Sequence, residues 1–435
     1  MLTRLRLEQF KNFKDANLSL GPLTILVGTN ASGKSNVRDA FRFLHGVGRG
    51  YRLAEIIGEK WGEGGVLQWR GIRGGTRETA YYGSRTFTLS AAFSFAGQPP
   101  VTYTIEVEPD AGALGSRVVR ESLYGGETML FDSHPAHIPS QQDDPKHIMV
   151  RIIPGGSHRK WPMERFIADQ PVLSRIGDEL KGRRDTGAAQ VREVARNVLD
   201  ALAAMRFLDL HPEAMRSPSL PGQIVLGDRG ENLSSVLQAI YADDGHKGAL
   251  VQWLQDLTPM DVESIEFSPD QIGRILATLV EHDGRRTSVY SASDGTLRFL
   301  AMLAALLAPE PAQLYFIEEL ENGIHPTRLY LLLQLIEQRV SKTKIQVVGT
   351  THSPQLLHFL RPGDAPDILD YATLVYRLPD RPDAHLQRIV DLPPVRELIE
   401  RQDIGRLLEA GFLEDAVAFQ ADPDAGVPVE DRVSV

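Results

Sequence analysis

The pattern of apolar and polar residues predicts an α/β structure at the start of the chain. Leu2–Phe10 alternates apolar and charged residues, which is typical of a strand, and a turn is expected near residues 11–15. Leu23–Val27 is an almost continuous apolar run, which is typical of a strand buried on both faces in a parallel sheet. A glycine-rich turn follows this run, and residues 36–44 have the apolar spacing of a helix.

The middle of the chain has a different pattern. Residues 86–89 and 101–107 alternate with period two, so residues 84–125 are expected to form an antiparallel hairpin region. Residues 126–160 are rich in proline, glycine and histidine and are predicted to be loop. The apolar spacing of residues 163–206 predicts helix.

The second half returns to strands and helices in alternation. Helices are expected over residues 232–242 and 247–257, and strands over residues 272–280 and 286–290. The next predicted elements are a helix, a buried strand, a helix and another buried strand, at residues 293–307, 313–317, 327–340 and 344–349. This order is typical of α/β domains. The end of the chain, from Ala421, is rich in Pro, Asp and Gly and is expected to be frayed.

Composition excludes several classes of function. The chain has 47 Lys and Arg against 57 Asp and Glu, which gives a formal net charge of −10. This charge argues against a protein that binds nucleic acid over its whole surface, but it allows a local basic patch. It has no cysteine, so disulfides, thiolate metal sites and a cysteine nucleophile are excluded. The longest apolar run, residues 299–308, is about half of the ~20 residues that a membrane span needs. With no signal-peptide pattern at the start, we expect a cytoplasmic protein without a membrane partner.

Residues 28–35, Gly-Thr-Asn-Ala-Ser-Gly-Lys-Ser, match the phosphate-binding pattern G-x-x-x-x-G-K-[ST] between a predicted strand and a predicted helix. The glycines allow the backbone to fold around a phosphate, and the amides of the loop and the positive end of the helix dipole then face the anion. Lys34 is expected to reach the β- and γ-phosphates, and the Ser35 hydroxyl is expected to bind Mg²⁺. The nucleotide-binding residues predicted here are Gly28, Asn30, Ala31, Ser32, Gly33, Lys34 and Ser35.

Two further predicted strands end in residues that suit this chemistry. Glu318 and Glu319 follow an apolar strand, and because parallel strands end at the ligand crevice, their carboxylates are expected to face the nucleotide. Glu318 would hold Mg²⁺ and Glu319 would polarise the attacking water, while a merely acidic helix N-terminus is the structural alternative. His352 ends another buried strand, where a neutral imidazole can donate a hydrogen bond to the γ-phosphate.

A further motif, Ser-Ala-Ser-Asp-Gly-Thr-Leu-Arg at residues 291–298, opens an apolar helix before the carboxylate strand. With these motifs in this order, the chain resembles ABC-type ATPases of the SMC/RecF class. It is most similar to short bacterial RecF-like AAA-family ATPases, which are related to the ATPase module of OLD-family proteins. Residues 28–35 followed by Asn36 resemble the Walker A motif, Ser293 and Gly295 the signature motif, and residues 318–321, 323–326 and 351–354 the Walker B motif, D-loop and H-loop.

The resemblance implies a P-loop NTPase of the ABC/SMC head type. Such a fold has a mainly parallel core sheet flanked by helices, an antiparallel β subdomain and, here, a short helical insertion. The implied organisation is head lobe I over residues 1–125, a loop-rich and helical insertion over 126–215, head lobe II over 216–412 and a tail over 413–435. ATP and Mg²⁺ are the implied cofactors, and ATP hydrolysis is the implied reaction.

The signature motif implies a dimer. In this class its serine and glycine, here Ser293 and Gly295, cap the γ-phosphate bound by a second copy, so a homodimer is expected to close on two ATP molecules. The resemblance also implies that Asn12, in the opening Phe-Lys-Asn-Phe-Lys segment, binds nucleotide. Gln68 is the implied Q-loop ligand of the metal, and an ordinary polar residue beside Trp69 is the alternative interpretation.

Two positions depart from the Asp-Glu-Pro-Glu of the family. Glu318 stands in place of Asp, which lengthens the metal-binding arm by one methylene, and Leu320 stands in place of Pro. Since Mg²⁺ can be held by either carboxylate through water, ATP hydrolysis is still expected.

Two alternatives remain for the biological role. One is a DNA-related ATPase in repair or in defence against foreign DNA, and the other is an ATP-gated scaffold for a separately encoded effector protein, a nuclease or toxin. Basic side chains can contact DNA phosphates, although a solvated charged face is the simpler alternative. They gather in two clusters, Lys181, Arg183, Arg184, Arg192 and Arg196, and Arg70, Arg73 and Arg77. The segment after His352 is short for a nuclease domain, so a nuclease fusion is not expected.

Overall fold

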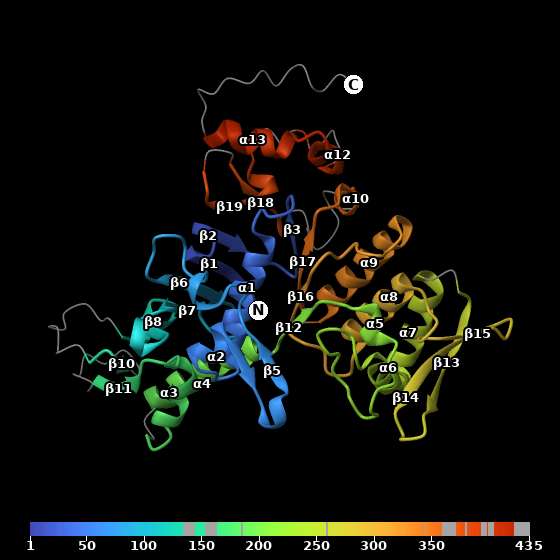
Figure 1. Cartoon of the computed structure of the whole chain (residues 1–435), viewed down its shortest axis with the longest axis horizontal. Helices are drawn as coiled ribbons and strands as arrows, with labels where there is room; N and C mark the ends of the chain where they lie inside the picture. The colour runs from blue at the N-terminus through green and yellow to red at the C-terminus, as the bar shows by residue number, and fades with distance from the viewer. Residues whose placement is uncertain are drawn as a thin grey trace. The chain divides into compact units, whose positions relative to one another are not determined.

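The computed structural model describes residues 1–133, 144–152, 163–183, 186–257, 260–343, 345–358, 371–378, 381–392, 398 and 404–421. The chain divides into two compact units (Figure 1). Unit 1 comprises Met1–Gly21, Gly28–Met205 and Thr373–Arg388, and unit 2 comprises Pro22–Val27, Arg206–Ala372 and Ile389–Val435. Each unit therefore combines segments that lie far apart in the sequence.

Unit 1 contains a largely antiparallel sheet. Its strands are β1 (Leu2–Phe10), β2 (Phe13–Ser19), β6 (Phe87–Phe93), β7 (Val101–Glu108), β8 (Arg117–Gly125), β9 (Thr128–Asp132), β10 (His147–Ile152), β11 (Met163–Ile167), β18 (Ala372–Arg377) and β19 (Ala384–Arg388). Their order in the sheet is β11-β10-β9-β8-β7-β6-β1-β2-β19-β18. The pairing of β19 with β2 is parallel, and Ala384 there lies opposite Phe13.

The period-two pattern explains these strands. In β6 and β7 every second side chain is buried, so one face of the hairpin joins the core. A separate hairpin pairs β4 (Glu59–Trp61) with β5 (Leu67–Arg70). The helices of unit 1 are α1 (Lys34–Gly48), α2 (Leu53–Ile57), α3 (Leu173–Glu179) and α4 (Thr186–Ala203).

Helix α1 packs on the sheet through its aromatic residues. The Phe43 ring meets the Phe87 ring edge-on, with the ring centroids 5.3 Å apart. At its end α1 comes very close to α4, because a Cβ placed on Gly48 would lie 2.6 Å from the Cβ of Leu202. The end of α1 therefore requires glycine, and the helix that follows the glycine-rich turn is fixed firmly in the unit.

Unit 2 contains the parallel strands expected from the sequence. Strand β3 (Leu23–Val27) pairs in parallel with β17 (Gln346–Thr351), and β17 pairs in parallel with β16 (Leu314–Ile317). The order β3-β17-β16 ends with β12 (Met205–Leu208). All residues of β3, β16 and β17 are buried, which confirms the prediction from their apolar runs.

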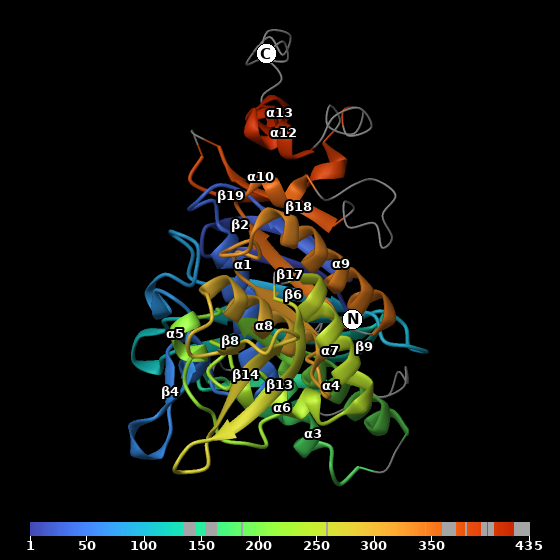
Figure 2. The ribbon, with the colours of Figure 1, turned by 90° about the vertical axis from the view of Figure 1, so that its right-hand side faces the viewer.

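A second sheet in unit 2 joins β13 (Val262–Pro269), β14 (Ile275–Glu281) and β15 (Arg286–Ser288). Helices α6 (Leu233–Tyr241) and α7 (Asp244–Leu257) contact this sheet, and α8 (Asp294–Leu307) contacts both helices (Figure 2). The remaining helices of unit 2 are α5 (Pro212–Met215), α9 (Pro326–Lys342), α10 (Pro354–Leu357), α12 (Ile404–Glu409) and α13 (Phe412–Ala421).

The predictions for several segments were wrong. The turn expected at residues 11–15 is shorter, because β2 already begins at Phe13. The segment predicted as loop, residues 126–160, contains β9 and β10, and the segment predicted as helix from residue 163 begins with β11. The antiparallel region at residues 84–125 and the helices at 232–242, 247–257, 293–307 and 327–340 are confirmed, within a few residues at their ends. The end after Ala421 lies outside the described residues.

Among the residues that the structure describes, none of the helices has the length and apolar character required to cross a membrane.

Candidate functional site

The glycine-rich loop, residues 28–35, connects β3 to α1, as the sequence predicted. Gly33 has a φ of 125°, and a Cβ there would lie 2.9 Å from Asn12 Nδ2. A Cβ on Gly28 would lie 2.2 Å from the carbonyl oxygen of Val375. Both positions therefore need glycine, one for its backbone conformation and its neighbours and the other for space. Ala31 also adopts a positive φ, of 63°, so the loop bends sharply between the two glycines.

The loop ends at a helix N-terminus that is suited to an anion. The N-cap residue, Gly33, has no side chain that could cap the first turn of α1, and that turn contains no acidic residue. The amide groups of a first turn have no acceptor within the helix and carry partial positive charge. The Lys34 ammonium adds a full charge and folds back over the loop, donating to the carbonyls of Gly28 and Thr29, the latter at 2.8 Å. These donors fit a polyphosphate.

Ser32 supplies a further polar group in the same loop. Its side chain is buried, and within the described residues its hydroxyl oxygen has no hydrogen-bond partner. A buried polar atom without a partner is costly, since it loses its interactions with water. The loop therefore has unused hydrogen-bonding capacity.

Asn12 and Asn36 join the loop to the turn between β1 and β2. The Asn36 side-chain amide donates to Asn12 Oδ1 at 2.7 Å, and Asn12 Nδ2 donates to the carbonyl oxygen of Ser32 at 3.5 Å. The structure thus brings both predicted asparagines to the loop, where Asn12 supports its backbone.

The turn that carries Asn12 is held by a buried ion pair. The Lys11 ammonium lies 3.5 Å from the Asp39 carboxylate, which also accepts a hydrogen bond from Arg73 at 3.2 Å. Burial lowers the pKa of Lys11, and the attraction of Asp39 opposes that change. Since Asp39 lies on α1, this cluster fixes the β1–β2 turn against the helix that follows the loop.

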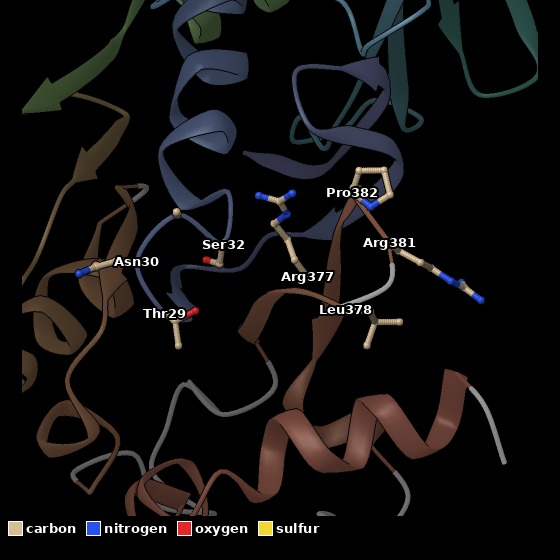
Figure 3. A pocket seen from close by; sticks show the side chains of 8 residues that line it. Thr29, Asn30, Ser32, Arg377, Leu378, Arg381 and Pro382 are labelled. Atoms are coloured by element: carbon tan, nitrogen blue, oxygen red, sulfur yellow. The ribbon is translucent and has the colours of Figure 1, made fainter. Parts of the chain in front are cut away.

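A pocket borders the glycine-rich loop on the side of the β18–β19 turn (Figure 3). Its volume is about 560 Å³, within the range of small-molecule sites. The loop contributes one wall and the turn the other, and the lining residues are Thr29, Asn30, Ala31, Ser32, Arg377, Leu378, Arg381 and Pro382. In the sequence, Arg377 and Arg381 flank a proline-containing segment after an apolar run, but no local pattern indicates that they lie beside the loop.

The carboxylates in unit 2 lie at the end of β16. Glu319 has a φ of 52°, and its backbone amide donates to the Thr350 hydroxyl at 3.0 Å. The Asn322 side chain donates to the Glu319 carboxylate at 3.1 Å. Because β16 and β17 are parallel, the ends that carry Glu319 and His352 lie at the same edge of the sheet.

Glu321 makes contacts that the sequence did not predict. One of its carboxylate oxygens accepts a hydrogen bond from the His352 amide at 3.2 Å and lies 3.5 Å from the imidazole Nδ1. The Glu321 side chain is only 12% exposed, and its other oxygen is buried without a hydrogen-bond partner in the described residues. Glu321 therefore positions both the backbone and the ring of His352.

The departure at Leu320 has a structural reason. Its backbone amide donates to the carbonyl oxygen of Thr350 at 3.1 Å, a bond that proline cannot form. Its side chain is fully buried, and a Cβ on Gly349 would lie 2.0 Å from Leu320 Cδ1. The leucine thus fills the space that the glycine of β17 leaves open.

The signature residues lie at the exposed start of α8. The Ser293 hydroxyl caps the helix, accepting from the Thr296 amide at 3.2 Å. Gly295 packs against the D-loop, since a Cβ there would lie 2.4 Å from the Gly323 carbonyl oxygen. Arg216 holds the segment by donating to the Ala292 carbonyl at 3.1 Å and to the Asp294 carboxylate at 2.9 Å. The structure therefore joins the signature segment to the turn after the carboxylates.

Residues 23–121 and 131–358 match the family model described as "AAA domain, putative AbiEii toxin, Type IV TA system". The chain belongs to this family. The matched segments include the glycine-rich loop, the signature segment, the carboxylates and His352. The family match confirms that the chain has an AAA domain, as expected, and the fold is α/β, as predicted.

Solved structures of SMC heads are similar in outline. The Smc head bound to the C-winged-helix domain of ScpA is 13% identical with a TM-score of 0.49, and the alignment covers 89% of this chain and 97% of that chain. For the SMC head domain from Thermotoga maritima the values are 12% identity, a TM-score of 0.40, and 89% and 98% coverage. No curated protein was found to match the sequence.

The family implies nucleotide binding, typically with Mg²⁺. The residues of the loop fit it, because they offer amides, an ammonium and the Ser35 hydroxyl. In unit 2, Glu318 directly follows β16 and supplies a carboxylate of the kind that Mg²⁺ binds. Magnesium prefers oxygen ligands and is commonly held by one or two protein groups together with phosphates.

Gln68 lies apart from these groups. It is exposed on the β4–β5 hairpin, where its amide lies against Gly62. The same strand is bound to the middle of α1, because Arg42 donates to the Arg70 carbonyl at 2.7 Å. The structure does not bring Gln68 to the glycine-rich loop, and the alternative interpretation, a polar residue beside the buried Trp69, is the one that its surroundings favour.

The basic cluster on residues 181–196 is largely engaged within unit 1. Lys181 pairs with Asp178 at 2.6 Å, and Arg183 pairs with Glu164. Arg192 donates to the carbonyls of Leu180 and Arg183 at 2.6 and 2.8 Å. Arg184 lies outside the described residues. In the second cluster Arg73 is bound to Asp39.

Proposed function

We propose that this protein binds and hydrolyses ATP with Mg²⁺. The observation that carries the proposal is the glycine-rich loop. Its helix N-terminus without a side-chain cap, its Lys34 ammonium and its Ser32 hydroxyl, which has no hydrogen-bond partner within the described residues, are donors that suit a polyphosphate. When bound, Mg²⁺ would neutralise charge on the phosphates. Ser35 and Glu318 would hold the metal.

Glu319 is the proposed general base. Its carboxylate is oriented by Asn322, which leaves the remaining acceptor sites to orient an attacking water and take its proton. His352, fixed by Glu321, would donate a hydrogen bond to the γ-phosphate. The positions of Glu319 and His352 after β16 and β17, at the same edge of the sheet, support these roles.

We further propose that two copies close on two ATP molecules. Ser293 and Asp294 are exposed at the N-terminus of a helix of 14 residues, where partial positive charge is available to a second copy's phosphate. The packing of Gly295 on Gly323 would pass a change at the carboxylate segment to this surface.

The test uses two variants and a matched control. Lys34→Ala should lose ATP binding, measured by titration calorimetry. Glu319→Gln should bind ATP but not hydrolyse it, and should elute as a dimer in size-exclusion chromatography with ATP and Mg²⁺, whereas Glu310→Gln, at an exposed site in the loop after α8, should behave as wild type. If Glu319→Gln binds ATP yet stays monomeric at saturation, the dimer proposal is wrong.

For the biological role, the ion pair of Arg183 with Glu164 and the hydrogen bonds of Arg192 to backbone carbonyls favour the effector scaffold over direct DNA contact. The family description, which names a toxin of a toxin–antitoxin system, supports a role in defence. The ATPase rate with and without duplex DNA at low salt distinguishes the alternatives. Stimulation that disappears as salt is added would support DNA binding, and an unchanged rate would support the scaffold.

A further inference from the structure

We propose that Leu220 and Tyr290 form an apolar surface beside the signature segment, and that a second copy of this chain binds to it when ATP is bound. The proposal rests on the proposed function, because it adds a protein contact to the interface that Ser293 would make with the second copy's nucleotide. Neither the family match nor the sequence motifs assign a role to these two residues.

Two segments that lie far apart in the sequence meet at the start of β14. Ser219 exchanges backbone hydrogen bonds with Ile275 at 3.0 and 2.8 Å, and the Val289 amide donates to the Ala277 carbonyl at 3.0 Å. Ile275 and Ala277 are two residues apart on one strand, a distance of about 7 Å. The residues that directly follow Ser219 and Val289 therefore lie near each other.

These following residues are apolar and exposed. The exposed fraction is 61% for Leu220 and 68% for Tyr290, and Ile272, in the turn that leads into β14, is 73% exposed. The Tyr290 amide donates to the Ser288 hydroxyl at 3.1 Å. The Ile272 amide donates to the Asp270 carboxylate at 3.0 Å. The exposed side chains thus stand on turns that hydrogen bonds hold, and a cluster of exposed apolar side chains is typical of a surface that contacts another protein.

Arg216 connects this apolar surface to the signature segment. It lies three residues before Ser219, and its guanidinium donates to the Ala292 carbonyl at 3.1 Å and to the Asp294 carboxylate at 2.9 Å. On the other side of the surface, the chain reaches Ser293, the N-cap of α8, three residues after Tyr290. The apolar surface is therefore adjacent to the helix start that would face the second copy's phosphates.

The charges around the apolar surface favour a protein partner over a nucleic acid. Asp294 pairs with Arg216 at 2.9 Å, and Asp270 pairs with Arg274 at 2.8 Å. Side chains that neutralise each other in this way provide no excess of positive charge for a phosphate backbone. An apolar surface that contains a tyrosine and lacks net charge resembles the centre of a protein interface.

The size of the surface favours a partner that binds only with ATP. Three large side chains expose on the order of 400 Å², whereas a stable interface buries about 800 Å² on each partner. The surface alone is therefore too small for a permanent complex and needs a further attraction beside it. ATP held between Ser293 and a second copy supplies that attraction, so the second copy is the partner that fits.

The experiment measures the dimerisation of Glu319→Gln with ATP and Mg²⁺ by analytical ultracentrifugation, alone and with a second substitution. Tyr290→Ser should raise the dissociation constant of the dimer about tenfold, and Leu220→Ser should also raise it. Tyr290→Phe keeps the ring and should dimerise as its parent does. Ile167→Ser is the matched control, because Ile167 is 46% exposed on the edge strand β11 of the sheet in unit 1, and it should also leave the dimer unchanged.

Binding of a fluorescent ATP analogue, at protein concentrations below the dissociation constant of the dimer, should be the same in all of these variants, which excludes a folding defect. Unchanged dimerisation of Tyr290→Ser would overturn the apolar surface, and so would an equal loss in Tyr290→Phe or Ile167→Ser. Failure of the proposed function is visible separately, because Glu319→Gln alone would then stay monomeric with saturating ATP, and the apolar surface would fall with it.

Discussion

The buried Glu121 should make the stability of unit 1 depend on pH. Its side chain is fully buried, and its carboxylate accepts hydrogen bonds from the Val172 amide at 2.7 Å, the Leu173 amide at 2.8 Å and the Tyr103 hydroxyl at 3.0 Å. Burial raises the pKa of Glu121 to about 7, although the two amides and the tyrosine favour the charged form. The group therefore links β7, β8 and the start of α3 through an acid that titrates near neutral pH.

The direction of this pH effect follows from the pKa of Glu121 in the folded and in the unfolded state. The folded pKa of Glu121 is raised above its unfolded value of 4.5, so the folded state binds the proton more tightly. The stabilisation is complete below about pH 4.5 and is lost as the pH rises toward 7. At about 1.4 kcal/mol for each unit of pKa, this group alone should lower the free energy of unfolding by about 2–3 kcal/mol between about pH 5 and about pH 8.

Urea denaturation of the wild type and of Glu121→Gln at these two pH values tests this estimate. Other groups can also contribute to the pH dependence, so the quantity of interest is the difference between the two proteins. Glutamine cannot ionise, so the variant should lose about 2–3 kcal/mol less than the wild type on going to the higher pH. Parallel pH dependences in the two proteins would refute the reasoning, whatever their absolute stabilities.

Two further predictions concern the carboxylate segment. Leu320→Pro removes the hydrogen bond to the Thr350 carbonyl and the leucine side chain, so it should destabilise the protein by about 3 kcal/mol in urea denaturation, while Leu320→Met should cost less than about 1.5 kcal/mol. An equally stable proline variant would show that this bond is unimportant. Glu321→Ala should lower kcat for ATP hydrolysis at least tenfold with little change in KM, and Glu321→Gln should retain most of the activity, because an amide oxygen still accepts from the His352 amide. Equal activity of Glu321→Ala and wild type would exclude the positioning role.

The parts of the site that the sequence predicted are those defined within short stretches of chain. The strand, glycine-rich loop and helix of residues 23–48 follow one another directly, so local pattern and spacing suffice. The carboxylates and His352 were predicted for a similar reason, since each follows an apolar run that proved to be a buried parallel strand. The order of the motifs along the chain also indicated the AAA family, and the family match over residues 23–121 and 131–358 confirms it.

The parts that were missed depend on contacts between distant segments. Strand β10 has the period-two pattern, with Ile148, Val150 and Ile152 buried, but the proline, glycine and histidine around it favoured loop. Strand β2 carries charged residues and is stabilised by pairing with β1 on one side and β19 on the other. The position of Arg377 beside the glycine-rich loop depends on that same long-range pairing, which no local pattern reveals.

Residues with an unfavourable backbone conformation occur both in the predicted and in the missed parts of the site. Within the described residues, the non-glycine residues with positive φ are Gln9, Lys11, Ala31 and Glu319, and all of them lie beside or within the segments described above. Such a conformation costs about 1–2 kcal/mol in a residue with a Cβ, and glycine would relieve the cost, so each side chain must be retained for another reason. For Lys11 the reason is its buried pair with Asp39, and for Glu319 it is the carboxylate itself. Ala31 lies between Gly28 and Gly33 and lines the pocket, so the positive φ there belongs to the sharp bend by which the loop turns from β3 into α1.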